Sequence, residues 1–232
     1  MNVGLVLGVG PDRGMGAQLC KRFASQGLHV VVSGRTKDKL ECVVSAIEKE
    51  GGSANSIVAD ATIENEVKEL FSRAEEKGNI DLAVYNAGNN IPGSLQEMTA
   101  QYFEDAWRVC CYGGFLFGRE AARIMTSRGS GTIIFTGASA SLRGRAGFGA
   151  FNSSKAGLRG FAQALAKECG PQGIHVGHVV IDGAINDEKV TKRYPEFVKK
   201  VGNDRLIQVE SIVDAYEFLW KQLVTGWSFE VD

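Results

Sequence analysis

The sequence lacks an excess of either charge. Its 26 basic and 27 acidic side chains leave a formal net charge of −1 over 232 residues. Proteins that bind nucleic acid or an anionic membrane surface usually carry a clear basic excess. The balance therefore argues against both kinds of partner.

Long hydrophobic runs are missing as well. No uninterrupted apolar stretch approaches the roughly 20 residues of a membrane span. Glycines at positions 4, 8 and 10 leave no room for the apolar region of a secretory signal. We therefore expect a soluble, cytoplasmic protein with no membrane partner.

Cysteine is scarce and is not arranged in pairs. The chain has five cysteines, an odd number, and no Cys-x-x-Cys motif. This pattern argues against a disulfide framework and against a zinc site. Reduced thiols and the absence of a metal are the simpler expectation.

Proline is rare, whereas glycine is abundant. The 4 prolines and 29 glycines together stay well below the roughly 25–30% that is typical of low-complexity chains. Disorder therefore does not explain the glycine excess over the average usage of about 7%. The positions of the glycines become the informative feature.

Short apolar runs alternate with helical patterns along the whole chain. The predicted strands are 3–8, 28–32, 55–59, 80–85, 131–136, 174–181 and 227–231, and the predicted helices are 14–26, 36–50, 62–77, 99–127, 148–169 and 210–223. Continuous apolar strands separated by helices are typical of a parallel sheet that is covered on both faces. The sequence predicts an α/β fold, a single domain over residues 1–232 with one doubly wound seven-stranded parallel sheet. Residues 184–205 have no clear period and are a candidate flexible lid.

A glycine-rich turn joins the first predicted strand to the first predicted helix. It contains Gly8, Gly10, Gly14 and Gly16, with Met15 between the last two. Such a turn lets backbone amides approach a pyrophosphate, which then sits at the positive N-terminus of the helix. The alternative is a turn that merely needs positive φ. The strand-turn-helix context favours a dinucleotide in a Rossmann fold.

The end of the second predicted strand distinguishes between two dinucleotides. An NAD-binding unit usually carries a carboxylate there, on the ribose 2′-hydroxyl. Here the strand ends Ser33-Gly34-Arg35, and Arg13 lies inside the glycine-rich turn. Two guanidinium groups can clamp a 2′-phosphate through forked hydrogen bonds. We therefore expect NADP(H) rather than NAD(H), the alternative being two solvated surface arginines.

The motifs together resemble those of the short-chain dehydrogenase/reductase family over the full length of the chain. The matching residues are Gly10-x-x-x-Gly14-x-Gly16, Asp60 with Ala61, Asn86-Ala87-Gly88, Lys155 and Gly183. The resemblance implies a cofactor site formed by these residues, with Asp60 at the adenine and Lys155 at the nicotinamide ribose. It also implies a homodimer or homotetramer. Relatives carry a short tail after the seventh strand, so the end at Asp232 is compatible with a truncation.

The catalytic positions of the family are where this chain departs from it. In the family a Tyr four residues before the Lys is the proton donor, and this chain has Phe151 there. The same alignment puts Ala138 at the position of the family's catalytic Ser and Cys111 at the position of its Asn. No tyrosine lies between Tyr112 and Tyr194, so no small gap restores the missing hydroxyl.

Two functions are compatible with this pattern. The first is an oxidoreductase that acts on a small carbonyl or alcohol and takes its proton from Ser139, Tyr194, Lys155 or a bound water. The second is a cofactor-binding module without turnover, a sensor or an assembly partner. We favour the enzyme because the resemblance covers the whole chain, which is an argument from analogy. Nothing in the sequence identifies the substrate.

Overall fold

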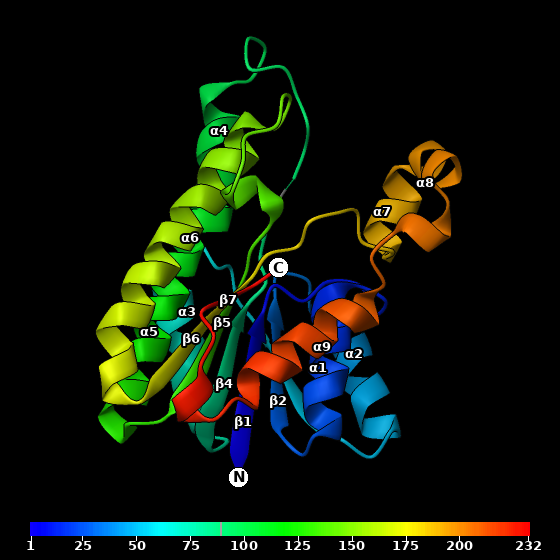
Figure 1. Cartoon of the computed structure of the whole chain (residues 1–232). Coiled ribbons are helices and arrows are strands. Elements are labelled where there is room, and N and C mark those ends of the chain that lie inside the picture. Colours follow the sequence, from blue (N-terminus) through cyan, green and yellow to red (C-terminus); the bar gives the residue numbers. More distant parts are fainter. Residues whose placement is uncertain (89) are drawn as a thin grey trace.

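The computed structural model describes residues 1–88 and 90–232, without the side chains of Lys189 and Asn203. It contains a seven-stranded sheet with the strand order β3-β2-β1-β4-β5-β6-β7 (Figure 1). All neighbouring strands are parallel. The strands are β1 (Asn2–Leu7), β2 (His29–Gly34), β3 (Ser53–Val58), β4 (Asn79–Tyr85), β5 (Gly131–Thr136), β6 (Ile174–Val179) and β7 (Glu230–Val231).

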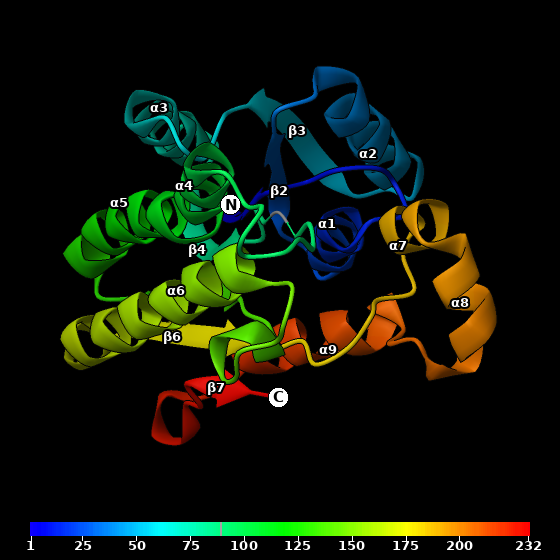
Figure 2. The same ribbon diagram turned by 90° about the horizontal axis from the view of Figure 1, so that it is seen from above.

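Helices cover both faces of this sheet, as Figure 2 shows. One face carries α1 (Met15–Ser25), α2 (Lys37–Lys49) and α9 (Val209–Trp220), whose apolar residues share one core cluster. The other face carries α3 (Glu64–Glu75), α5 (Gly113–Arg128) and α6 (Gly149–Cys169), which share a second cluster. The predicted doubly wound α/β architecture is confirmed.

The burial of the central strands explains why their sequences are continuously apolar. Every residue of β2 is buried, and so are five of the six residues of β1, because helices pack on both faces. Since all strands are parallel, their carboxyl ends lie at one edge of the sheet. The order reverses between β1 and β4, which is where ligands usually bind in such folds.

The helix predicted over 99–127 is interrupted in the structure. It consists of α4 (Ala100–Trp107), a π-helical turn η1 (Arg108–Tyr112) and α5. The buried Tyr85 hydroxyl donates a hydrogen bond to the Val109 carbonyl, within the irregular turn. Such single π turns are frequent at functional sites. The spacing of apolar residues could not predict the π-helical turn, because Tyr85, which hydrogen-bonds to it, lies on a strand that is distant in sequence.

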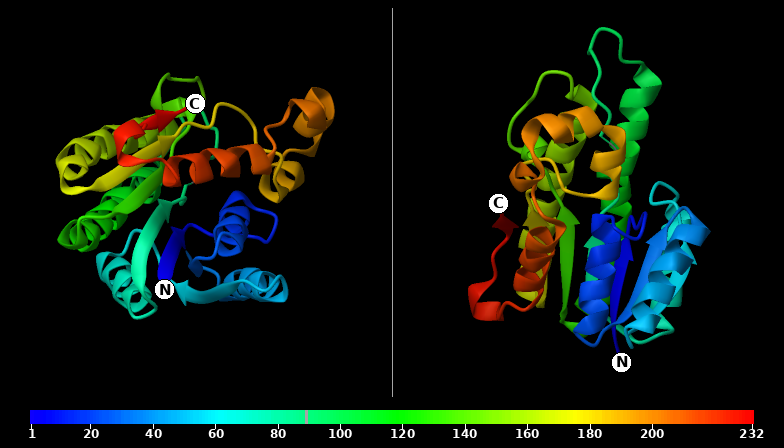
Figure 3. Two further views of the ribbon diagram at one scale, coloured as in Figure 1. Left: turned by 60° about the horizontal axis from the view of Figure 1, so that its bottom comes forward. Right: turned by 90° about the vertical axis from the view of Figure 1, so that its right-hand side faces the viewer.

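The segment 184–205, a candidate flexible lid with no clear period in its sequence, contains two short helices. They are α7 (Glu188–Arg193) and α8 (Pro195–Val201), followed by a 3₁₀ turn, η4 (Asn203–Arg205). Figure 3 shows them beyond the carboxyl ends of the strands, away from both helical layers. The Asp187 side chain accepts a hydrogen bond from the Val190 amide and caps α7. That this segment acts as a lid stays a prediction.

Within the described part of the chain, every helix is too short or too polar to cross a lipid bilayer.

Candidate functional site

A cavity of about 770 Å³ opens at the carboxyl edge of the sheet. Nearly all of the residues predicted to form the site line it: Gly8, Gly10, Gly14, Met15, Gly16, Arg35, Asp60, Ala61, Asn86, Ala87, Gly88, Ser139, Lys155, Gly183 and Tyr194. Positions spread over most of the sequence meet there because each follows a parallel strand or begins the next helix. Arg13 is exposed and does not belong to the lining.

The glycine-rich turn forms one wall of the cavity. Gly8 has φ +106°, and a Cβ on it would lie 2.3 Å from the Ala87 amide nitrogen, so only glycine fits. A Cβ on Gly10 would meet no described atom within 4 Å, so this part of the turn borders open space. No side chain caps α1, and its first turn holds no acidic residue. An uncapped helix N-terminus beside an open glycine turn fits a pyrophosphate group.

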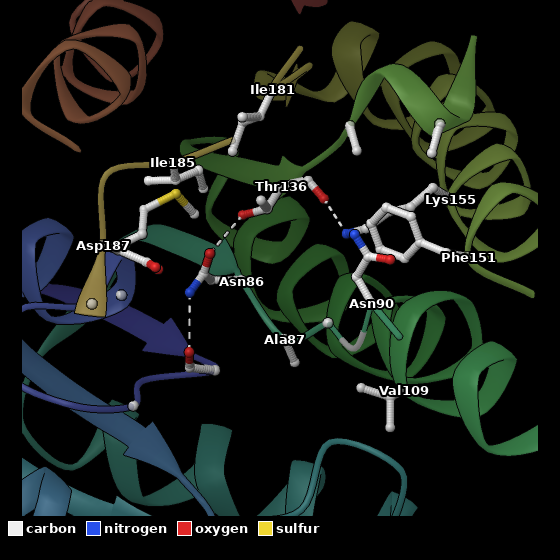
Figure 4. A pocket seen from close by; sticks show the side chains of 18 of the residues that line it. Asn86, Ala87, Asn90, Val109, Thr136, Phe151, Lys155, Ile181, Ile185 and Asp187 are labelled. Atoms are coloured by element: carbon white, nitrogen blue, oxygen red, sulfur yellow. Dashed lines mark hydrogen bonds between the residues drawn. The ribbon is translucent and has the colours of Figure 1, made fainter. Parts of the chain in front are cut away.

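A chain of hydrogen bonds connects this turn to Lys155 (Figure 4). The Asn86 amide donates to the Gly8 carbonyl at 3.0 Å, and the Thr136 hydroxyl donates to the Asn86 side-chain oxygen at 3.1 Å. The Lys155 ammonium then donates to the Thr136 carbonyl at 2.6 Å. The turn, the end of β4, the end of β5 and the start of α6 are thereby held in one arrangement.

Lys155 is almost completely buried, with 3% of its surface exposed. Its ammonium lies 5.8 Å from the centre of the Phe151 ring, one helical turn earlier on α6. A cation over an aromatic face is stabilised by the ring, more strongly when water is excluded. The ring provides no hydroxyl, so Phe151 can hold Lys155 in place but cannot pass on a proton.

Thr136 and Tyr216 are functional neighbours that the sequence did not reveal. The Tyr216 hydroxyl shares a 2.6 Å hydrogen bond with the Thr136 hydroxyl, and its ring is fully buried behind the cavity. Burial raises the pKa of Tyr216 above its usual value, so this phenol stays protonated. Thr136 ends a predicted strand and could have been noticed there. Tyr216 lies on α9 with no motif around it.

Cys110 and Cys111 of the π-helical turn pack against different glycines. A Cβ on Gly88 would lie 3.6 Å from the Lys155 nitrogen and 3.9 Å from the Cys110 sulfur. The Cys111 sulfur instead packs 2.9 Å from the position of a Cβ on Gly157. Cys110 therefore faces Gly88, and Cys111 faces Gly157. That Cys111 takes the position of the family's Asn stays a prediction.

Ala138 and Ser139 both line the cavity where the chain leaves β5. The Ser139 amide donates to the Ile181 carbonyl, which fixes the loop. The hydrogen-bonded Arg143 guanidinium holds the pKa of Asp182 below its usual value. Ser139 contributes a hydroxyl to this part of the lining, whereas Ala138 contributes only a methyl group.

Arg35 lies at the other end of the cavity, next to Asp60. The two side chains form a long ion pair of 3.9 Å, and 71% of the Arg35 side chain is exposed. Asp60 itself accepts hydrogen bonds from the amide and hydroxyl of Thr62. Arg35 therefore remains available to an anion. Arg13 forms no ion pair with any described side chain and is not part of the lining.

The described residues contain no group of three or more His, Cys, Asp or Glu side chains that could hold a metal ion.

Comparisons with known proteins agree with this arrangement. The family model described as short chain dehydrogenase matches residues 4–195. The chain is 35% identical over 178 residues to a short-chain dehydrogenase/reductase of Armillaria gallica, an alignment that covers 75% of this chain and 67% of that protein. It is 32% identical over 205 residues to the short-chain reductase protein NovJ of Streptomyces niveus, covering 88% and 75%. A crystal structure of a short-chain dehydrogenase from Rhodopseudomonas palustris superposes with a TM-score of 0.85 at 34% identity, covering 99% of this chain and 96% of that one.

Proposed function

Because the chain belongs to the short-chain dehydrogenase family, we propose that it is an NADP(H)-dependent oxidoreductase acting on a small carbonyl or alcohol compound. One observation carries this proposal. The glycine-rich turn and the buried Lys155 line the same cavity and are joined through Asn86 and Thr136. A site for a dinucleotide and a site for a reacting oxygen are therefore adjacent.

The glycine-rich turn and the N-terminus of α1 hold the pyrophosphate of the cofactor. Gly10 leaves room for it, and the uncapped amides of the first helical turn face it. Arg35 holds the 2′-phosphate, since it ends β2 at the position where an NAD-binding unit carries a carboxylate. When bound, the cofactor donates or accepts the hydride.

Lys155 binds the carbonyl oxygen of the substrate and supplies the proton that this oxygen takes up. The ammonium is directed by the Thr136 carbonyl and by the Phe151 ring, so it is oriented before substrate arrives. A buried positive charge stabilises the negative charge that develops on a carbonyl oxygen during reduction. Phe151 has no hydroxyl proton to give, whereas Lys155 carries three ammonium protons. Lys155 is therefore our choice of proton donor.

Titration with the two cofactors tests the binding half of the proposal. Calorimetry should give a dissociation constant for NADPH at least about tenfold below that for NADH, since a charged hydrogen bond contributes about 1.5–3 kcal/mol. Equal affinities would contradict the role of Arg35.

Hydride transfer tests the catalytic half. NADPH that carries deuterium on one face of C4 is incubated with the protein and a panel of aldehydes, ketones and activated alkenes. We expect slow, stereospecific transfer of deuterium into one product. Tight NADPH binding without any transfer would instead favour the second candidate, a cofactor-binding module, for which Phe151 is the specific observation.

A further inference from the structure

The backbone after β4 passes Lys155 on its way to α4. A Cβ on Gly88 would lie 3.6 Å from the Lys155 nitrogen, so this stretch runs beside the ammonium. Asn90 follows two residues later and also lines the cavity. Two residues of chain span at most about 7 Å. Figure 4 shows the Asn90 amide on the same side of the cavity as Lys155 and Phe151, and we take these three side chains as one end of the cavity.

Hydrogen bonds hold the backbone that follows Asn90. The Tyr102 hydroxyl of α4 donates to the Ile91 carbonyl at 2.9 Å and accepts from the Ile91 amide at 3.2 Å. The Gly93 amide donates at 2.8 Å to the carbonyl of Gly147, in the loop before α6. The segment is thereby tied to α4 and to the loop that leads into α6, so Asn90 starts from a fixed backbone.

The Asn90 side chain is available to a ligand. Asn90 is exposed, and no residue that the structure describes hydrogen-bonds to its amide group. Asn152 also lines the cavity, but its amide nitrogen donates to the Arg145 carbonyl at 3.0 Å. The Asn90 amide therefore keeps two N–H donors and one carbonyl acceptor for a molecule in the cavity.

A substrate oxygen at Lys155 has room for a second hydrogen-bond donor. A carbonyl oxygen has two lone pairs and gains negative charge as hydride adds to its carbon. Phe151 and Ala138 line the cavity without a hydroxyl, so neither can serve as the second donor. A fixed amide N–H directed at a developing oxyanion is among the strongest contributions that a side chain makes to catalysis. Asn90 supplies such an N–H at this end of the cavity.

We propose that Asn90 is a catalytic residue whose side-chain amide donates a hydrogen bond to the carbonyl oxygen of the substrate. Lys155 donates to the same oxygen, so the developing negative charge lies between an ammonium and an amide. As hydride adds to the carbonyl carbon, the π electrons of the C=O bond move to oxygen, and one proton of Lys155 bonds there. The carbonyl compound is reduced and the dinucleotide is oxidised, while Asn90 keeps its own protons. This inference rests on the proposed function, to which it adds a second donor.

A coloured aldehyde reports this hydrogen bond without turnover. The protein is saturated with NADP⁺, which has no hydride to give, and 4-(dimethylamino)cinnamaldehyde is titrated while its absorption spectrum is recorded. Donors at the carbonyl oxygen draw electron density from the amino group, which moves the absorption maximum to longer wavelength. We expect such a red shift with the wild type and about half of it with Asn90→Ala, because one of two donors is lost. Equal shifts in both proteins, or no shift in the wild type, would overturn the inference.

Further variants separate a hydrogen bond from a structural role. Asn90→Asp keeps the shape of the side chain but replaces the donor with a carboxylate, so the red shift should fall at least as far as in Asn90→Ala. Asn90→Gln keeps a donor and should retain part of the shift. Asn186→Ala is the matched control, because the Asn186 amide donates to Gln208 at 3.0 Å and lies outside the lining. A shift that is full in Asn90→Asp would exclude a donated hydrogen bond.

Ser139 is the competing donor, since its hydroxyl also belongs to the lining. Ser139→Ala is therefore measured beside Asn90→Ala with the same aldehyde. We expect the larger loss of the red shift in Asn90→Ala. A loss in Ser139→Ala with a full shift in Asn90→Ala would assign the second hydrogen bond to Ser139 and overturn the inference.

Hydride transfer separates this inference from the proposed function. Asn90→Ala should lower the rate constant for reduction of a saturating aldehyde by about 10²–10³-fold, the usual effect of removing one donor from an oxyanion, and leave NADPH affinity unchanged. Equal rate constants in Asn90→Ala and the wild type would overturn the inference and leave the function standing. A red shift that depends on Asn90, with no hydride transfer to any aldehyde, would support the donor and contradict the enzyme.

Discussion

Phe151 is the residue nearest to Lys155 along the same face of α6. Its ring packs beside the ammonium at 5.8 Å and supplies no hydroxyl, although it lies one helical turn from Lys155 on the same face. A tyrosine there would place a phenol beside a buried positive charge, which lowers a phenol's pKa and promotes proton transfer. The difference between the two side chains is a single oxygen atom.

Restoring that oxygen should increase activity. The double variant Phe151→Tyr with Ala138→Ser is expected to raise the rate of NADPH-dependent aldehyde reduction by about 10²–10⁴-fold, the usual contribution of a general acid. The rate is followed by NADPH absorbance under saturating aldehyde. Phe148→Tyr is the control, since Phe148 also lines the cavity but precedes α6. An unchanged rate in the double variant would mean that the site has diverged beyond these two side chains.

Two glycines of the same turn should respond differently to an added methyl group. Gly10→Ala places its Cβ in open space, so the melting temperature should stay close to that of the wild type while NADPH affinity falls about tenfold or more. Gly8→Ala should instead destabilise the fold, because its Cβ would lie 2.3 Å from the Ala87 nitrogen at φ +106°. Thermal melts and NADPH titrations of both variants check this. Undiminished NADPH binding by Gly10→Ala would argue against a pyrophosphate at this position.

At the scale of elements, the Glu230 carboxylate connects strand β7 to its neighbours. β7 is short, pairing with β6 only at Glu230 and Val231. Glu230 accepts hydrogen bonds from Arg159 of α6 at 2.6 and 2.8 Å, and its carboxylate lies 2.9 Å from His178 Nδ1 of β6. The Arg159 guanidinium, and then His178, hold the pKa of Glu230 below its usual value, although partial burial opposes them. Three elements therefore meet at this side chain.

Removing that charge should weaken the edge of the sheet. Glu230→Gln is expected to lower the free energy of unfolding by about 1–3 kcal/mol, because it breaks a partly buried charged hydrogen bond. Glu104→Gln is the control: its ion pair with Arg108 is exposed and 3.8 Å long, so the expected loss is below about 0.5 kcal/mol. Urea denaturation of both variants gives the two values. Equal losses would show that Glu230 contributes no more than a surface pair.

At the scale of the whole molecule, two buried histidines make stability depend on pH. Burial lowers the pKa of both His175 and His178 below the value of an exposed imidazole. Between the lowered pKa and about 6.5, the unfolded chain binds more protons than the folded one, so stability rises with pH. The stability from each histidine is complete above about pH 6.5 and is lost as pH falls below it.

Denaturation at several pH values checks this dependence. Between about pH 7.5 and pH 5.5 we expect the free energy of unfolding to decrease, with a slope of at most about 1.4 kcal/mol per pH unit for each histidine. His178→Gln should flatten that slope, whatever its effect on stability at pH 7.5. A slope identical to that of the wild type would exclude His178 as a contributor.

The homodimer or homotetramer stays a prediction, which a measurement of the molecular mass in solution would check.

Much of this architecture was readable from the sequence. The apolar runs predicted the sheet and its helices, because a buried parallel strand must be apolar. The glycines between positions 8 and 16 predicted a tight turn after the first strand, and this turn forms one wall of the cavity. The position of Phe151 beside Lys155 could also be predicted, since a helix places residues four apart on one face. These features depend on residues that are near one another along the chain.

Tertiary structure decided the contacts between distant segments. It brought Tyr216 behind Thr136, directed Cys110 rather than Cys111 toward Gly88 and left Arg13 outside the cavity. It also folded residues 184–205 into two short helices and brought Arg193 to the cavity that Arg145 lines. The physical reason is the same in each case: local periodicity determines which face a side chain occupies, whereas its partner depends on how strands and helices far apart in sequence pack together.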